Sequence, residues 1–306
     1  MTDHEHLDRD PRRQPVYNII ANPNAAEYSK QKIKYLIDQL TAAGCRYFLT
    51  EPESPKDTAY YIKRIITKRP TGIIICGGDS TVTIVARNVI RRMIRLGIYP
   101  LGRFNNIYRS IYGQPDLKVA LAHIMSGREK RIDYGLASGY FFLGSVALGL
   151  IPELYELLKE KKTPRLAISW SRLAAQAAAS VIIKPLSIKV DSFKFDFSPI
   201  TLNINLLSHS AGLPLVPVSI MDDGKCEVVF DVGQNKVIMS NYIRQIFKGK
   251  YIYSDDVRVF RGEKIAVTPV EGAKLYIDGE ITRLHSNELR IETFPQKIRI
   301  FYKSER

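Results

Sequence analysis

One stretch decides the fold: residues 73–81 read Ile-Ile-Ile-Cys-Gly-Gly-Asp-Ser-Thr. The β-branched run is typical of a buried strand, and the apolar positions Val82, Val85 and Val89 that follow are typical of one helix face. A strand, a glycine turn and a helix N-terminus can bind an anion, because unpaired amides point at the ligand and glycine lets it approach. The stretch predicts a phosphate site, although an ordinary turn between a strand and a helix has the same pattern.

Strands and helices alternate around this stretch. Strands are predicted over Val16–Ala21, Cys45–Thr50, Gly72–Cys76 and Ile98–Leu101. Helices are predicted over Lys30–Ala43, Pro55–Lys68, Thr81–Leu96 and Pro115–Ser126, with Met93 on the inner face of the third. This alternation predicts a parallel sheet covered on both faces, with the ligand at the carboxyl ends of the strands.

The pattern changes near Arg131. A hairpin is predicted from two strands, Arg131–Leu136 and Tyr140–Ala147, and helices are predicted over Pro152–Glu160, Arg165–Val181 and Val237–Phe247. Short strands dominate from Leu186 onward and end with Glu288–Phe294 and Lys297–Tyr302. Such a series predicts an antiparallel sandwich or a barrel-like second domain.

Composition limits the classes of function. The chain has 306 residues and a formal net charge of +14, which indicates an anionic partner such as a membrane surface or a nucleotide. No zinc-finger or RNA-stacking signature accompanies this charge, so we do not expect a nucleic-acid partner. The three cysteines are far apart, which predicts neither a metal site nor a disulfide framework. The longest apolar run, Tyr140–Ile151, is shorter than the ~20 residues that span a bilayer, so a cytoplasmic, peripheral protein is expected.

Five segments in a fixed order carry a resemblance to a known family. They are Asn22-Pro23, the Gly-Gly-Asp turn, Gly102–Asn106, Ile132–Gly135 and Asp278-Gly279-Glu280. In this order the chain resembles the diacylglycerol kinase catalytic family, which includes bacterial lipid kinases and sphingosine kinases. The resemblance implies a doubly wound α/β N-terminal domain, as in NAD kinase and diacylglycerol kinase, and a mainly antiparallel β-sandwich C-terminal domain.

The resemblance also implies domain limits. A flexible tail is expected over residues 1–15, followed by a nucleotide-binding domain over 16–136. A β-rich domain for the lipid substrate is expected over 137–284. The family pattern adds that the C-terminal segment, about residues 285–306, returns to the first domain.

Roles for individual residues follow from the same resemblance. Asp278 would accept the proton of the acceptor hydroxyl, with Glu280 beside it. Asp79 and Asp133 would belong to a network of water around Mg²⁺. The nucleotide would be bound by residues that match the family's loops: Asn22, Thr50, Gly77, Gly78, Asp79, Ser80, Thr81, Gly102, Arg103 and Asn105. Without the resemblance, Asp133 would be read as a turn-capping aspartate and Asp278-Gly279 as a β-turn.

Four departures from the family pattern lie in these loops. Ala26 stands where the family has glycine, and Ser80 replaces a glycine whose φ can be positive. Arg103 and Phe104 replace a threonine and a small residue. Asn106 replaces an aspartate and brings no negative charge to a cation.

The expected activity is transfer of phosphate from ATP, with Mg²⁺, to a lipid hydroxyl such as that of diacylglycerol at an anionic membrane surface. The departures leave open a catalytically impaired homologue that binds lipid or nucleotide. A kinase with another acceptor, such as NAD, is a third alternative, because NAD kinases share the Gly-Gly-Asp turn. A homo-oligomer is compatible with all three.

Overall fold

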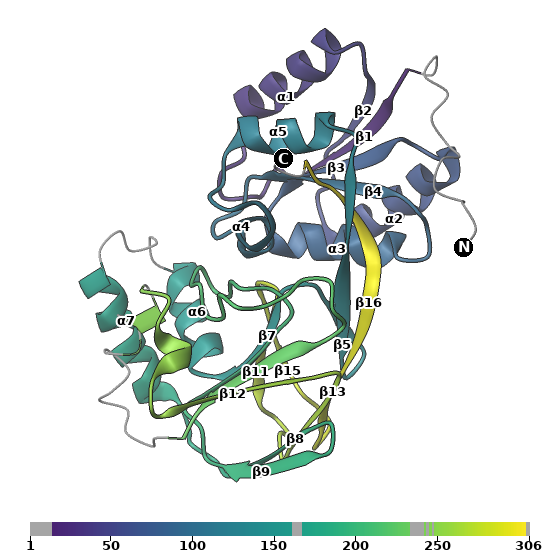
Figure 1. Cartoon of the computed structure of the whole chain (residues 1–306). Helices are drawn as coiled ribbons and strands as arrows, with labels where there is room; N and C mark the ends of the chain where they lie inside the picture. The colour runs from purple at the N-terminus through teal and green to yellow at the C-terminus, as the bar shows by residue number, and fades with distance from the viewer. Residues whose placement is uncertain (1–13, 161–166, 233–241, 243–244, 247, 304–306) are drawn as a thin grey trace. The chain divides into compact units, whose positions relative to one another are not determined.

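The computed structural model describes residues 14–160, 167–232, 242, 245–246 and 248–303. The predicted tail over residues 1–15 lies outside this part except for its last two residues. Most of the predicted helix over 237–247 also lies outside it. The chain forms two compact units, and each is described by itself (Figure 1).

The first unit takes its described residues from Met1–Arg103, Asp116–Lys130 and Arg299–Arg306. Its parallel sheet has the order β2-β1-β3-β4, and the end of β16 pairs with β4 through Arg299 and Ile300. The strands are β1 Val16–Ala21, β2 Arg46–Thr50, β3 Gly72–Gly77, β4 Arg95–Pro100 and β16 Leu289–Phe301. Figure 1 shows helices α1 and α5 on one face of the sheet and α2 and α3 on the other, which is the predicted arrangement.

Three helices of this unit begin after a capping side chain, whereas the helix that follows Gly78 has no such cap. The helices are α1 Lys30–Ala42, α2 Pro55–Ile65, α3 Asp79–Val89 and α5 Leu117–Met125, and a short 3-10 helix, Ile66–Lys68, follows α2. Ser29, Ser54 and Asp116 each accept hydrogen bonds from amides of the first helical turn. Helix α1 then buries Ile33, Leu36 and Leu40 at helical spacing.

The predicted helix over Thr81–Leu96 is wrong at its C-terminal end. Helix α3 stops at Val89, and strand β4 already begins at Arg95. Met93, predicted to face inward, is 68% exposed. The apolar pattern continued past the helix because Ile94 and Leu96 are buried at the entry to the strand.

The second unit comprises Phe104–Pro115 and Arg131–Ile298. Its helices are α4 Asn106–Tyr112, α6 Leu150–Glu160 and α7 Ala167–Ser180, with a 3-10 turn at Tyr251–Tyr253. One six-stranded antiparallel sheet has the order β12-β11-β10-β7-β14-β15. These strands are β7 Ser145–Gly149, β10 Thr201–Asn205, β11 Cys226–Asp231, β12 Val257–Gly262, β14 Lys274–Ile277 and β15 Glu280–Arg283.

A second group of strands lies against this sheet. Strand β16 pairs with β13 Lys264–Thr268, which pairs with β8 Leu186–Val190, and β8 pairs with β9 Phe193–Phe197. The predicted hairpin is formed by β5 Glu129–Ala137 and β6 Tyr140–Phe142. The two final strands predicted from the sequence are one continuous strand, β16.

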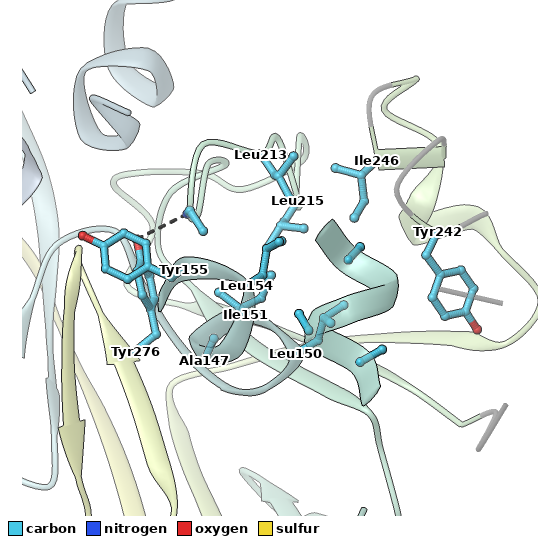
Figure 2. Close-up of a cluster of buried hydrophobic side chains, with 14 of the residues drawn as sticks. Ala147, Leu150, Ile151, Leu154, Tyr155, Leu213, Leu215, Tyr242, Ile246 and Tyr276 are labelled. Carbon is cyan, nitrogen blue, oxygen red and sulfur yellow. Dashed lines mark hydrogen bonds between the residues drawn. The ribbon is translucent and has the colours of Figure 1, made fainter. Parts of the chain in front are cut away.

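The six-stranded sheet is buried on both faces. Along β7, Val146 and Leu148 enter the core between the two sheets, whereas Ala147 enters the core beneath α6 and α7. Figure 2 shows the second core, where Ala147, Leu150 and Leu154 lie together. This period-two alternation is the geometry of a strand, and it gives a sandwich with helices on its outer face. The predicted fold class is confirmed.

Candidate active site

The Gly-Gly-Asp turn has the predicted geometry in the first unit. Strand β3 ends at Gly77, Gly78 is the extended residue before the helix, and Asp79 begins α3. Asp79 is buried, with 8% of its surface exposed. A carboxylate in the first turn is favoured by the helix dipole, and the turn presents backbone amides at the carboxyl end of the sheet.

The two glycine loops of this unit touch each other. A Cβ atom on Gly78 would lie 3.0 Å from the Cα of Gly102, and the amide of Leu101 donates to the carbonyl of Gly77 at 3.0 Å. Backbone therefore meets backbone where β3 and β4 end. Such a surface has no side chain to hold a phosphate group away from the amides.

Asn22 joins the end of β1 to the same place. Its side-chain amide donates to Thr81 Oγ1 at 3.0 Å, and its backbone amide donates to the carbonyl of Cys76 at 2.9 Å. Thr50 pairs with Ile20 and ends β2. The structure thus brings Asn22 and Thr81 together and leaves Thr50 at the neighbouring strand end, on the edge of the sheet.

Ser80 does not need a positive φ in this structure. It lies in the first turn of α3, and it is not among the residues with positive φ. Serine at this position therefore requires no left-handed backbone. Arg103, the other polar departure in this unit, is exposed in the loop after β4.

Phe104 begins the second unit and is not part of an open phosphate loop. Its side chain is 7% exposed and belongs to the core beneath α6 and α7. The ring centroids of Phe104 and Tyr155 lie 5.9 Å apart. Replacing Phe104 by a small residue, as the family pattern has here, would leave a cavity in this core.

Asn105 and Asn106 begin helix α4, which the sequence patterns did not predict. Asn105 has φ 51° and ψ 46°, a left-handed conformation that asparagine tolerates better than most residues. Asn106 Oδ1 accepts a hydrogen bond from the amide of Gly212 at 2.8 Å. Both side chains are buried, and that of Asn106 contacts the backbone of the same unit.

Asp133 lies in β5 and is 1% exposed. Its two carboxylate oxygens accept hydrogen bonds from the amides of Gly224, at 2.6 Å, and Gln296, at 2.7 Å. Burial raises the pKa of this carboxyl, and the two amides oppose the shift. Asp133 therefore lies inside a strand, and its carboxylate contacts amides 91 and 163 positions away in the same unit.

Asp278 is oriented by three consecutive backbone amides. Its Oδ2 accepts from Leu143 at 2.6 Å, and its Oδ1 accepts from Gly144 and Ser145, each at 2.9 Å. Asp278 and Gly279 both have positive φ and connect β14 to β15 as a two-residue hairpin. The turn and the amides together fix a buried carboxylate, 4% exposed, at the end of the six-stranded sheet.

Tyr155 supports this hairpin, a role that the sequence patterns did not predict. Its hydroxyl donates to the carbonyl of Gly279, and its ring lies 5.0 Å from the ring of Tyr276. Figure 2 shows Tyr155 and Tyr276 close together. The hydroxyl of Tyr276 accepts a hydrogen bond from the amide of Ala211 at 3.3 Å. A tyrosine within an amphipathic helix is read as core, so only the fold reveals this contact. Glu280, predicted beside Asp278, is exposed at the start of β15.

A protein-only magnesium site is absent from the described residues, which hold no group of three or more histidine, cysteine, aspartate or glutamate side chains arranged for a metal. The side-chain oxygens of Asp133 and Asn106 accept hydrogen bonds from backbone amides. Mg²⁺ commonly binds through one or two carboxylates together with substrate phosphates and water. Asp79, the other predicted metal residue, lies in the first turn of α3 beside the glycine turn.

Comparison with known proteins identifies the family. Residues 17–137 match the diacylglycerol kinase catalytic domain, and residues 144–302 match the YegS C-terminal NAD kinase beta sandwich-like domain. The chain belongs to the diacylglycerol kinase catalytic domain family, with a YegS-like C-terminal domain. The resemblance found in the motifs is therefore confirmed.

Relatives in this family match along most of the chain. A diacylglycerol kinase of Staphylococcus carnosus is 22% identical over 86% of this chain and 87% of its own length. A diacylglycerol kinase of Staphylococcus saprophyticus is 23% identical over 92% of this chain and 94% of its own. A crystal structure of a diacylglycerol kinase from Bacillus anthracis has a TM-score of 0.72 and 18% identity, and it covers 95% of this chain and 97% of that one.

The diacylglycerol kinase family uses ATP and acts on lipid, so a nucleotide and a lipid are the ligands to consider for this chain.

Among the described helices, none has the length and apolar character needed to cross a bilayer.

Proposed function

We propose that this protein is a lipid kinase that transfers the γ-phosphate of ATP to a lipid hydroxyl such as that of diacylglycerol. The hydroxyl oxygen forms a bond to the γ-phosphorus, the bond from that phosphorus to the ADP oxygen breaks, and the hydroxyl proton passes to Asp278. The products are ADP and a lipid phosphate. Phosphoryl transfer needs positioning and charge neutralisation more than covalent help from the protein.

One observation carries the proposal: the carboxylate of Asp278 is held by the amides of Leu143, Gly144 and Ser145. A general base must be positioned before the proton moves, and backbone donors fix a carboxylate without the mobility of a long side chain. Tyr155 holds the next residue of the same turn through the carbonyl of Gly279. A carboxylate fixed in this way can orient a hydroxyl nucleophile.

The nucleotide-binding role of the first unit rests on its backbone. Gly78 and Gly102 approach each other closely, and the N-terminus of α3 follows. Amides at a helix N-terminus favour anions, so the phosphate chain of ATP suits this surface. Magnesium, when bound with the nucleotide, would neutralise phosphate charge.

The test is the substitution Asp278→Asn, which keeps the size of the side chain and removes its ability to accept a proton. We expect kcat for diacylglycerol phosphorylation to fall by at least about a hundredfold, the usual scale for a general base. The matched control is Asp191→Asn, because Asp191 also has positive φ and accepts backbone amides, those of Glu263 and Lys264, at another turn. Unchanged turnover in Asp278→Asn would sink the assignment.

A second candidate function is a homologue that binds nucleotide or lipid without catalysis. One observation favours it: the side-chain oxygens of Asp133 and Asn106 accept hydrogen bonds from backbone amides. Thermal shift with ATP, with and without Mg²⁺, combined with the lipid kinase assay, separates the two. Nucleotide binding without turnover of any lipid would favour this candidate. Phosphorylation of NAD instead of lipid would contradict both candidates and indicate a kinase that acts on NAD.

A further inference from the structure

A tight turn, Ser210–Leu213, lies between β10 and β11. The amide of Ser210 donates to the carbonyl of Leu213, and the amide of Leu213 donates to the carbonyl of Ser210, both at 2.9 Å. The two central residues, Ala211 and Gly212, have φ of 48° and 83°. The reciprocal hydrogen bonds and the two positive angles are those of a type I′ turn.

The core of the second unit fixes this turn. A left-handed backbone is disfavoured for alanine, so it persists only where the surrounding contacts impose it. Ala211 is fully buried and belongs to the core beneath α6 and α7. A Cβ on Gly212 would lie 2.6 Å from the ring of Phe104, so the turn also packs closely against that ring.

Two hydrogen bonds connect the turn to the support of Asp278. Ser145 Oγ donates to Ser210 Oγ at 2.8 Å, and the amide of the same Ser145 donates to Asp278 Oδ1. The amide of Ala211 donates to the hydroxyl of Tyr276, which lies two residues before Asp278. A shift of the turn would therefore move two residues on which the position of the carboxylate depends.

The segment that leads into the turn contacts the same support. The amides of Leu206 and Leu207 donate to the carbonyl of Gly144 at 2.9 and 3.1 Å. Gly144 in turn donates its own amide to Asp278 Oδ1 at 2.9 Å. The chain from Leu206 to Leu213 thus borders the carboxylate through backbone and side-chain contacts.

Asn106 anchors the turn from helix α4. It is the first residue of that helix and is 4% exposed, and its Oδ1 accepts the amide of Gly212 at 2.8 Å. The next residue, Ile107, lies beside the carboxylate support, because a Cβ on Gly144 would be 3.7 Å from Ile107 Cγ1. Without the acceptor oxygen, the amide of Gly212 would need another partner and the turn would lose a fixed contact.

We propose that Asn106 is a positioning residue for Asp278. Its side chain fixes the turn Ser210–Leu213, and the turn fixes Ser145 and Tyr276. The proposal rests on the proposed lipid-kinase function and gives Asn106 a part in the same reaction. It assigns this position to the general base and not to the cation, although the family pattern has an aspartate here.

The first test is steady-state kinetics of two Asn106 variants. Asn106→Leu keeps the approximate size and removes the acceptor, so kcat should fall at least about tenfold with little change in KM for ATP, because small displacements of a catalytic group are costly. Asn106→Asp keeps the acceptor oxygen and should recover most of this loss, with the Mg²⁺ dependence of the wild type. A lower Mg²⁺ requirement in Asn106→Asp, with wild-type kcat in Asn106→Leu, would assign the residue to the cation and overturn the proposal.

A double-mutant cycle separates positioning from general destabilisation. If Asn106 acts through Asp278, then in the Asp278→Asn background Asn106→Leu should change kcat by less than about twofold. Ser210→Ala, which removes the hydroxyl that Ser145 contacts, should show the same two results. Losses that multiply in the double variants would contradict the proposal.

Asn203→Leu is the matched control. Asn203 is also a buried asparagine of this unit, 1% exposed, and its side-chain nitrogen donates to Thr201 Oγ1 at 3.0 Å. Thermal unfolding records what each variant loses in stability. The control should keep the kcat of the wild type, and an equal loss of kcat in both variants would overturn the proposal.

Amide hydrogen exchange, followed by NMR, tests the contact without turnover. The amides of Leu143, Gly144 and Ser145 are those that the carboxylate of Asp278 accepts. Asn106→Leu should speed their exchange by about tenfold or more through local opening, and Asn203→Leu should not. Unchanged exchange in Asn106→Leu overturns the proposal whatever the kinase activity. Wild-type turnover in Asp278→Asn would instead defeat the proposed function and leave this measurement valid.

Discussion

Three amides in a row, those of Leu143, Gly144 and Ser145, surround the carboxylate of Asp278. The middle residue has no room for a side chain on that side: a Cβ on Gly144 would lie 2.9 Å from Asp278 Oδ1. Glycine is needed at this position because a side chain would collide with the carboxylate, and not because the backbone has a positive φ.

This contact gives a prediction for Gly144→Ala. The added methyl group should push the carboxylate away from its donors, so kcat should fall at least tenfold while KM for ATP changes little, because misplacement by about 1 Å is costly. Steady-state kinetics measures both constants. The control Gly262→Ala is also crowded, with Val190 at 2.6 Å, but lies away from Asp278. Equal loss of kcat in both variants would mean general destabilisation.

What the sequence could predict of the site depends on where its contacts lie. The turns at Gly77-Gly78 and Asp278-Gly279 are local signals, because glycine and aspartate favour particular backbone conformations. The partners of Asp278 could not be predicted, since they are amides that any residue type supplies. The same holds for Asp133, whose partner Gln296 is 163 positions away.

At the scale of the element, α4 is the helix that the sequence patterns missed. It has seven residues and buries Ile107, Tyr108 and Ile111. So short a segment carries too few apolar positions to show a helical period, and its N-terminus is set by the left-handed Asn105 instead of a serine or aspartate cap. Long periodic helices such as α1 and α2 were predicted to within a few residues.

Phe104, directly before α4, connects this region to the core of the second unit. We expect Phe104→Ala to lower the free energy of unfolding by about 3–5 kcal/mol, the usual cost of removing a buried phenylalanine ring. Urea unfolding measures it. The control Phe193→Ala removes a 65% exposed ring and should change stability by less than about 0.5 kcal/mol. A stable Phe104→Ala protein would contradict the packing described here.

His209 packs against α4 and gives a pH dependence. Its Nδ1 lies 2.9 Å from Ser208 Oγ, and burial, helped by Arg109, lowers its pKa to about 4. The folded state therefore holds the neutral ring: stability is complete above the unfolded pKa of 6.5 and is lost as pH falls toward 4.

The variant His209→Gln tests this. Between pH 7 and pH 4 the wild type should lose stability relative to His209→Gln, as followed by urea unfolding at each pH. His285→Gln changes an exposed histidine and should follow the wild type. A constant difference between wild type and His209→Gln across this range would refute the titration.

For the whole molecule, the formal net charge of +14 predicts peripheral binding to anionic vesicles. Sedimentation with phosphatidylglycerol vesicles should retain the protein at low salt and release it near 1 M salt, where the Debye length is about 3 Å instead of about 10 Å at 0.1 M. Phosphatidylcholine vesicles are the control. Equal retention by both, or retention independent of salt, would exclude an electrostatic surface. The possible homo-oligomer also stays a prediction, which light scattering would test by measuring the mass of the particle in solution.

Strand β16 has a consequence for how the protein is made. Its residues Leu289–Glu292 pair with β13, and Arg299 and Ile300 pair with β4. A ribosome delivers β4 long before it delivers this partner, and at about 5–20 residues per second the interval is on the order of tens of seconds. During that time the outer edge of β4 lacks its native neighbour, and such an edge is a template for pairing with other chains. The nascent chain should therefore depend on chaperones until translation reaches Arg299.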